Sequence, residues 1–230
     1  MYWLEDLKGL LFPEACVVCA AETRIAEAGL CLFCRHELPV VLSRPLQNHL
    51  PMVRKFEGLY PVSEAFAFLQ FGRSGNTRKI LHALKYGRKP ETGLLLGRLL
   101  AGELLERGLR DSPDLIIPVP MHPDKQRQRG YNQAMEFAIG LAAGLGCAAN
   151  DQILLKRKLT ETQTRKNKLA RILNTSEVFV LNEEKRDLLA GKKIWLADDV
   201  LTTGSTMMAS AAVLHKEPLA SLGMVSIAMA

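Results

Sequence analysis

Two adjacent carboxylates stand near the end of an apolar run in the segment IWLADDVLTTGST, residues 194–206. The run before Asp198 and Asp199 is typical of a buried strand. Carboxylates at the carboxyl edge of a parallel sheet lie where open α/β folds bind ligands. Apolar residues flank the pair on both sides, which argues against a simple surface or capping pair. The two aspartates are therefore candidates for binding a ligand that carries hydrogen-bond donors.

A loop rich in hydroxyls and glycine follows the aspartates, and a helical pattern begins near residue 204. Backbone N–H groups and hydroxyls at a helix N-terminus attract an anion such as phosphate. Neither the G-x4-G-K-[ST] loop nor the G-x-G-x-x-G motif occurs in the chain. A ribose 5-phosphate fits the pattern, with its phosphate in the loop and its 2′- and 3′-hydroxyls donating to the aspartates. The loop residues are Thr202, Thr203, Gly204, Ser205 and Thr206.

Four of the five cysteines form two Cys-x2-Cys pairs, Cys16 with Cys19 and Cys31 with Cys34. The N-terminus has no basic region of the kind that begins a signal peptide. We therefore expect a reducing, cytoplasmic setting that favours metal ligation over disulfides. Four thiolates would complete a closed, structural zinc site. The alternative is four ordinary buried cysteines, and Cys147 is expected to be a small buried hydrophobe.

The charge distribution points to an anionic ligand. Residues 1–60 carry six Lys/Arg against seven Asp/Glu, whereas residues 156–174 carry seven against one. Such a basic segment favours a polyanion, either a polyphosphate or a nucleic acid, although a solvated basic surface is the ordinary alternative. The net charge is +6, and no apolar run reaches the length of about 18 residues that a membrane span needs. We expect no membrane insertion.

Strands alternate with helices from about residue 110 onward, which predicts an α/β fold with a mostly parallel sheet flanked by helices. We expect a small zinc-binding domain with its linker over 1–60 and the α/β domain over 61–230. The expected helices span 1–12, 75–86, 92–109, 132–146 and 204–216. The expected strands span 61–70, 114–120, 153–158, 177–181, 192–197 and 223–230.

The segment IWLADDVLTTGST resembles the motif by which type I phosphoribosyltransferases bind phosphoribosyl pyrophosphate (PRPP). Three further stretches and the cysteine pairs make the whole chain resemble the ComF family, competence-associated proteins with a zinc-binding N-terminus and a phosphoribosyltransferase domain. The stretches are LKYGRKPETGLLLG (84–97), PVPMHPDKQRQRGYNQA (118–134) and RKLTETQTRKNKLARILNTSEVF (157–179). Two departures are Tyr131, where phenylalanine is common, and Pro218, which follows the last helix where glycine is frequent.

The resemblance implies a role for each matching residue. Asp198 and Asp199 would hold the ribose hydroxyls, and the five residues from Thr202 to Thr206 would hold the 5′-phosphate. The turn after LIIPVP takes the place of the pyrophosphate loop, with Lys125, Arg127 and Arg129 as charge partners. Asp198, Asp199 and Arg129 form the implied catalytic group, and one Mg²⁺ is implied between pyrophosphate and ribose oxygens. The basic segment around Arg157, Thr160, Gln163 and Arg171 matches the mobile loop that closes over PRPP in such enzymes.

Three functions remain open. The first is phosphoribosyl transfer from PRPP to an unknown acceptor, since no residue stands out as a general base. The second is a DNA-handling accessory of natural transformation that binds single-stranded DNA and works with the DNA-uptake machinery. Its contacts would come from Lys and Arg of residues 73–89 and 156–171, because nucleic-acid binding rests on cations that face phosphates. The third is a non-catalytic PRPP sensor that uses the same fold.

Overall fold

The structure is a computed structural model that describes residues 14–23, 27–42, 60–72, 75–109, 111–157 and 178–230. The helix expected over 1–12 and most of the basic segment 156–174 lie outside these residues. No helix in the described part of the chain is both long enough and apolar enough to span a bilayer.

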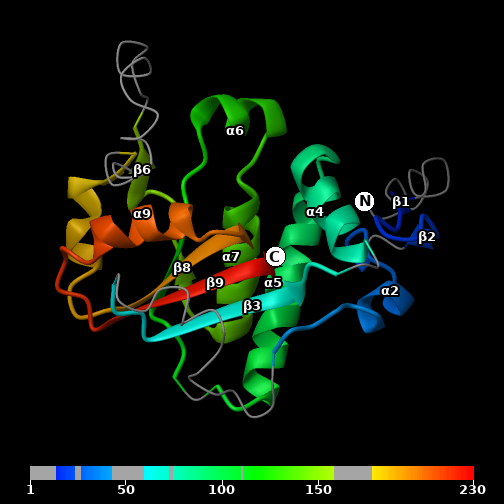
Figure 1. The fold of residues 1–230 in the computed structure, drawn as a ribbon, viewed down its shortest axis with the longest axis horizontal. Helices are drawn as coiled ribbons and strands as arrows, with labels where there is room; N and C mark the ends of the chain where they lie inside the picture. Colours follow the sequence, from blue (N-terminus) through cyan, green and yellow to red (C-terminus); the bar gives the residue numbers. More distant parts are fainter. Residues whose placement is uncertain (1–13, 24–26, 43–59, 73–74, 110, 158–177) are drawn as a thin grey trace, which may run out of the picture.

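Five parallel strands form the central sheet in the order β3-β9-β8-β4-β5 (Figure 1). Strands β8 and β9 each pair with a neighbour on both edges, and most of their residues are buried, as parallel strands covered on both faces require. The fold class expected from the sequence is confirmed. The bounds are β3 (Glu64–Gln70), β4 (Leu115–Pro118), β5 (Ala148–Ala149), β8 (Lys193–Leu201) and β9 (Ser221–Met229).

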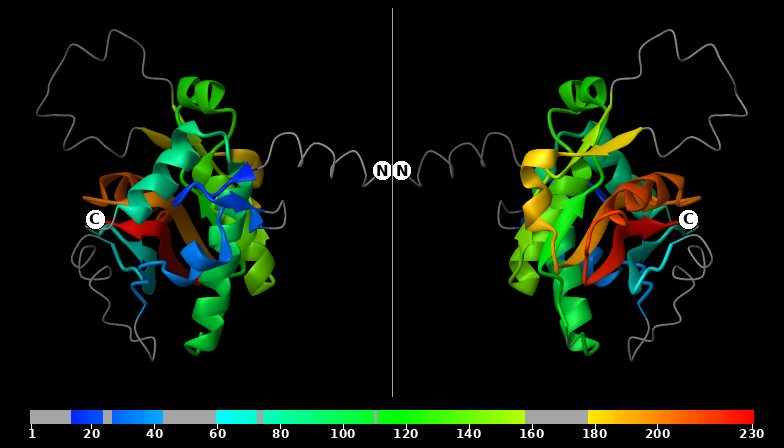
Figure 2. Two further views of the ribbon diagram at one scale, coloured as in Figure 1. Left: turned by 90° about the vertical axis from the view of Figure 1, so that its right-hand side faces the viewer. Right: turned by 90° about the vertical axis from the view of Figure 1, so that its left-hand side faces the viewer.

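Helices cover both faces of the sheet (Figures 1 and 2). Alternate residues of β9 join different apolar clusters, because successive side chains of a strand point to opposite faces. Val225 and Ile227 belong to the cluster that contains residues of α4, α5 and α7, and Leu222 and Met224 belong to the cluster that contains residues of α9. The bounds are α4 (Asn76–Tyr86), α5 (Pro90–Glu106), α7 (Gln133–Leu145) and α9 (Ser205–Leu214).

Helices α5 and α7 approach each other through glycine. A Cβ added at Gly97 of α5 would lie 2.2 Å from the carbonyl oxygen of Phe137, and one added at Gly140 of α7 would lie 2.0 Å from that of Leu94. No side chain fits in either place, so the two backbones can lie in direct contact. The contact lies within α7, whose first residues line the candidate site.

The cysteine-bearing segment packs against the outer side of α4 and α5 (Figure 1). It contains β1 (Glu14–Ala15), β2 (Glu22–Thr23) and α2 (Leu32–His36). The Nζ of Lys79 donates to the carbonyl of Val18 (2.8 Å), and the hydroxyl of Thr92 donates to that of Ala28 (3.0 Å). Buried residues of this segment share one apolar cluster with α4, so the segment and the sheet are joined by a common core. The boundary at residue 60 stays a prediction.

Two parts of the chain differ from the expected pattern. Strands β6 (Leu154–Lys156) and β7 (Phe179–Leu181) form a separate antiparallel pair and not part of the central sheet. The segment after β4, expected as a turn, contains the helix α6 (Pro123–Arg129), and the 3-10 helix η4 (Glu183–Leu188) follows β7. Pro123 is the first residue of α6, a position at which proline is favourable. His122 caps the helix, because its Nδ1 accepts from the N–H of Asp124 (3.2 Å).

Candidate functional site

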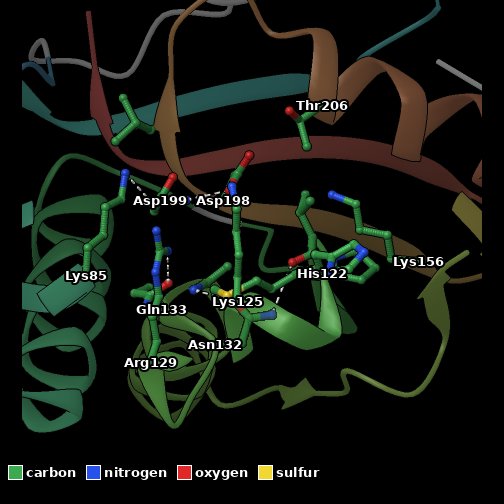
Figure 3. A pocket seen from close by; sticks show the side chains of 15 residues that line it. Lys85, His122, Lys125, Arg129, Asn132, Gln133, Lys156, Asp198, Asp199 and Thr206 are labelled. Atoms are coloured by element: carbon green, nitrogen blue, oxygen red, sulfur yellow. Dashed lines mark hydrogen bonds and ion pairs between the residues drawn. The ribbon is translucent and has the colours of Figure 1, made fainter. Parts of the chain in front are cut away.

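A hollow of about 240 Å³ lies near the carboxyl ends of β4 and β8, between these strands and α6 (Figure 3). Side chains from several strands and helices line it. The carboxyl ends of the strands are where open parallel sheets bind ligands. Of the sequence-predicted residues, the hollow brings together Asp198, Asp199, Lys125, Arg129 and Thr206. The other polar lining residues are Lys85, His122, Asn132, Gln133 and Lys156.

The two aspartates lie within β8 and not after it. The strand continues to Leu201, and Asp198 pairs with Ser226 in the register with β9. The N–H of Asp199 donates to Oδ1 of Asp198 (2.8 Å), and Oδ2 of Asp199 forms an ion pair with Nζ of Lys85 (2.8 Å). Adjacent residues of a strand normally face opposite ways, yet both side chains line the hollow.

The environment of Asp198 favours its neutral form. Burial, followed by the charge of Asp199, raises the pKa of this carboxyl to about 7, against the opposing effects of the Asp199 N–H, Lys85 and Lys156. Asp198 therefore keeps its proton to a higher pH than an ordinary aspartate does. A ligand that donates two hydrogen bonds would favour its ionised form.

Four cationic side chains converge on the same hollow from three elements (Figure 3). Lys85 comes from α4, Lys125 and Arg129 from α6, and Lys156 from β6. Burial lowers the pKa of Lys156, and the charge of Lys125 lowers it further. Because these cations outnumber the two carboxylates, the hollow is suited to a ligand with several negative charges.

The RGYNQ segment, residues 129–133, ties three elements together around the hollow. Gly130 ends α6 with φ 87°, a value that glycine adopts without strain. Asn132 caps α7 by accepting from the N–H of Ala134 (3.1 Å), and it donates to the carbonyl of Val119 after β4 (3.1 Å). The Tyr131 hydroxyl (2.5 Å) and Gln133 Nε2 (3.1 Å) both donate to the carbonyl of Leu84 at the end of α4.

The hydroxyl-rich loop begins α9 beside the hollow. Thr206 lines the hollow, whereas the four residues before it do not. Gly204 adopts φ 77° and offers no side-chain cap to the helix, and the N–H of Ser205 donates to the hydroxyl of Thr203 (3.4 Å). The N-terminus of α9 therefore reaches the hollow of the aspartates through Thr206, and a phosphate site there stays a prediction.

Other sequence-predicted residues lie elsewhere. The side chain of Arg127 is 72% exposed and pairs with Asp124 on its own helix. The N–H of Arg157 donates to the carbonyl of Val178 (2.9 Å), and its side chain is not part of the lining. Thr160, Gln163 and Arg171 lie outside the described residues.

Sequence reasoning assigned none of the five other polar residues of the hollow to the PRPP site, and it counted Lys85 and Lys156 only among the cations that would contact DNA. Asn132 and Gln133 stand in the RGYNQ segment and Lys85 in LKYGRKP, so the conspicuous blocks contained them. Their roles depend on which backbone carbonyl or carboxylate lies opposite, and no local pattern encodes that. Lys156 stood out only as part of the basic segment 156–174, and His122 carried no signal beyond its residue type.

The two cysteine pairs meet as expected. The sulfurs of Cys16, Cys19, Cys31 and Cys34 all lie within 4.8 Å of one another. Zinc–sulfur bonds of about 2.3 Å place the sulfurs of a tetrahedral site about 3.8 Å apart, and the Cys19 and Cys31 sulfurs are separated by 3.8 Å. Burial acts to raise the pKa of Cys16, but hydrogen bonds from the backbone lower it to about 6. The donor set fits a structural zinc ion. Cys147 stands apart and half-buried, and burial raises its pKa to about 11.

Comparison with known proteins identifies relatives over nearly the full length. The chain is 27% identical over 230 residues to the DNA utilization protein YhgH of Salmonella typhimurium, an alignment that covers 93% of this chain and 96% of that protein. It is 27% identical over 216 residues to competence protein F of Haemophilus influenzae, covering 89% and 92%. No family model matches the chain.

Solved structures with partial likeness include adenine phosphoribosyltransferases. The adenine phosphoribosyltransferase of Leishmania tarentolae aligns with 71% of this chain and 91% of its own, at 14% identity and a TM-score of 0.40. The allosteric regulatory enzyme of purine biosynthesis aligns with 58% of this chain at 18% identity and a TM-score of 0.41. This chain spans only a quarter of the length of that enzyme, 25%.

Proposed function

We propose, from the membership of this chain in the family of competence-associated ComF proteins, that it binds PRPP and transfers the phosphoribosyl group to a nitrogen nucleophile. One observation carries the proposal. Asp198 and Asp199 face four cations across a single hollow, beside the N-terminus of α9. Ribose hydroxyls, a pyrophosphate and a 5′-phosphate are the three groups that this arrangement would satisfy together.

Each part of PRPP would have its own partners. The ribose hydroxyls would donate to Asp198 and Asp199, and the 5′-phosphate would accept N–H groups at the start of α9. Lys125 and Arg129 of α6 would face the pyrophosphate. The oxygen donors of the hollow include the two aspartates, one of which pairs with Lys85. This fits a Mg²⁺ ion held largely by oxygens of the ligand itself, where it would neutralise part of the pyrophosphate charge.

The mechanism follows from the charges that develop. When pyrophosphate leaves C1, negative charge grows on the leaving group and positive charge grows on the ribose. Fixed cations on α6 would stabilise the leaving group without reorganisation. The carboxylates under the ribose would hold C1 in line between the leaving group and the nucleophile.

Calorimetric titration with PRPP, with and without Mg²⁺, tests the binding step. We expect the wild type to bind PRPP, and the double variant Asp198→Ala with Asp199→Ala to lose binding while its circular dichroism spectrum remains native. The matched control is Glu183→Ala with Glu184→Ala, an adjacent acidic pair exposed on η4. Binding that survives in the aspartate variant would refute the site.

Pyrophosphate release from PRPP tests the transfer step. The measurement adds nitrogen nucleophiles one at a time in the presence of Mg²⁺ and follows free pyrophosphate. Release that depends on a nucleophile supports transfer. Clear PRPP binding without release by any nucleophile would instead favour a PRPP sensor.

A role in handling single-stranded DNA is the second candidate. The name of the Salmonella relative refers to DNA utilization, and Arg78 and Lys79 are exposed on α4. Cations that contact phosphates make DNA binding fall steeply with salt. Neutralising Lys and Arg within residues 73–89 and 156–171 should flatten the salt dependence of single-stranded DNA binding. An unchanged slope would show that the contacts lie elsewhere.

A further inference from the structure

Lys85 forms an ion pair with Asp199, one of the two carboxylates that the proposed function assigns to the ribose hydroxyls. Its Nζ lies 2.8 Å from Oδ2 of Asp199, and the two side chains are only 27% and 21% exposed. An ion pair sheltered to this degree is screened less than a surface pair. Any ligand hydroxyl that donates to this oxygen must therefore compete with the ammonium.

The backbone at Lys85 is held, whereas its side chain can turn. The preceding carbonyl, that of Leu84, accepts from the Tyr131 hydroxyl (2.5 Å) and from Gln133 Nε2 (3.1 Å). Lys85 lies in the last turn of α4, which ends at Tyr86 and is capped by Gly87. A lysine carries its charge on a flexible four-carbon stem with rotatable donors. The ammonium can thus change partner while α4 stays in place.

A second anion would lie within the same hollow. Arg129, whose Nη1 is fixed by Oε1 of Gln133 (2.9 Å), lines it together with Lys85 and Lys125. The proposed function places the pyrophosphate against these α6 cations. An unpaired charge that is partly buried is costly. An ammonium that moves directly from a carboxylate to a phosphate avoids this cost, because it stays paired.

We propose that Lys85 exchanges partners on ligand binding: it is the counter-ion of Asp199 in the free protein and of the pyrophosphate once ribose hydroxyls have taken its place. This inference rests on the proposed function. The exchange makes the ribose and pyrophosphate subsites cooperative. Bound ribose hydroxyls release Lys85 for the pyrophosphate, and bound pyrophosphate draws Lys85 away from the carboxylate that the ribose hydroxyls need. Whole PRPP gains from both contacts, whereas ribose 5-phosphate alone must break the ion pair without replacement.

Two fragments of PRPP separate this exchange from a structural role. Calorimetric titrations at pH 8 use ribose 5-phosphate and pyrophosphate, each with Mg²⁺, alone and in the presence of the other. In the wild type, saturating pyrophosphate should tighten ribose 5-phosphate binding by about fivefold or more, the usual lower bound of a coupled pair of sites.

The variant Lys85→Met should respond with opposite signs. We expect pyrophosphate, in the presence of ribose 5-phosphate, to bind about tenfold more weakly than to the wild type, as for loss of one charge-assisted contact. Ribose 5-phosphate alone should bind as well as or better than to the wild type. The coupling between the two should disappear. Arg98→Met, which removes a cation exposed on the neighbouring helix α5, is the control and should leave both affinities unchanged.

Other outcomes overturn the exchange. Equal weakening of both fragments in Lys85→Met would assign Lys85 a structural role. Should this variant fail to fold, Lys85→Gln, which keeps a polar end, takes its place with the same expected loss of coupling. A wild type that binds PRPP but shows no coupling between fragments refutes the exchange and leaves the proposed function standing. A wild type that does not bind PRPP refutes both.

Discussion

Arg129 donates through Nη1 to Oε1 of Gln133 at 2.9 Å, across the short turn between α6 and α7. Gln133 is 1% exposed, and its Nε2 donates to the carbonyl of Leu84 at 3.1 Å. The buried amide of Gln133 therefore positions both Arg129, a cation of the hollow, and the end of α4, the helix that carries Lys85. The guanidinium also lies 5.7 Å from the centre of the Tyr86 ring, which limits its freedom further.

Replacing this amide should affect stability and binding together. Gln133→Leu leaves the Leu84 carbonyl with one donor fewer and frees Arg129, so we expect a loss of about 1–3 kcal/mol in the free energy of unfolding. PRPP affinity should fall by about tenfold, the equivalent of one well-placed charged contact. Urea denaturation and calorimetry measure the two effects. Gln128→Leu, at an exposed position of α6, is the control; an equal loss of affinity there would contradict the assignment.

The raised pKa of Asp198 makes stability depend on pH. Because burial and the Asp199 charge raise this pKa to about 7 in the folded chain, the folded state holds a proton that the unfolded chain releases near pH 4. The contribution of Asp198 to stability is therefore fully present below about pH 4 and is lost as the pH rises through about 7.

Asp198→Asn tests this sign. The variant should be more stable than the wild type by about 2–4 kcal/mol above pH 7, and the difference should vanish below about pH 4. Urea denaturation of both proteins across this range measures it. A variant that is less stable at pH 8 would show that the ionised carboxylate makes favourable contacts that outweigh its burial.

The order of strands and helices in the α/β part could be read from the sequence because alternating apolar runs encode it. The strand expected over 192–197 corresponds to β8, yet β8 continues through both aspartates to Leu201. Two carboxylates within a strand contradict strand propensity. The pairing of Lys85 with Asp199 had no local cue either, because the packing that brings α4 and β8 together is a property of the whole fold.

Helix α6 and the β6–β7 pair were misjudged for identifiable reasons. Three prolines between residues 118 and 123 indicated a turn, but the last of them, Pro123, starts a helix. Residues 153–158 and 177–181 have strand composition, and composition does not say which sheet a strand joins. The loop that begins α9 and the meeting of the cysteine pairs were predictable, because contiguous residues or fixed spacings define both.

The cysteine cluster should contain one zinc ion that supports α4. Cys16 and Cys34 are buried in the apolar cluster that includes Leu81 and Leu84 of this helix. Cys34→Ser should therefore abolish zinc binding, lower the melting temperature and weaken PRPP binding through the displaced end of α4. Metal analysis, thermal unfolding and calorimetry measure the three effects. Cys147→Ser, remote from the cluster, should retain the metal; a wild type that contains no zinc would contradict the prediction.

Two glycines of α5 should respond to alanine with opposite signs. At Gly97 a Cβ would lie 2.2 Å from the carbonyl oxygen of Phe137 in α7, and backbone cannot yield as a side-chain end can, so Gly97→Ala should destabilise the chain by about 1–3 kcal/mol. At Gly102 the added Cβ meets nothing within 4 Å, and alanine is the better helix former by up to about 1 kcal/mol. Gly102→Ala should thus stabilise the chain.

The same pair of variants tests whether the contact between α5 and α7 positions the hollow. Gly97→Ala would push α7 away and displace Gln133 at its start, so PRPP affinity should fall with stability, whereas Gly102→Ala should leave affinity unchanged. Urea denaturation and calorimetry give both values for each protein. If Gly97→Ala lost stability but bound PRPP as the wild type does, the start of α7 would be held by its cap at Asn132 and not by the contact with α5.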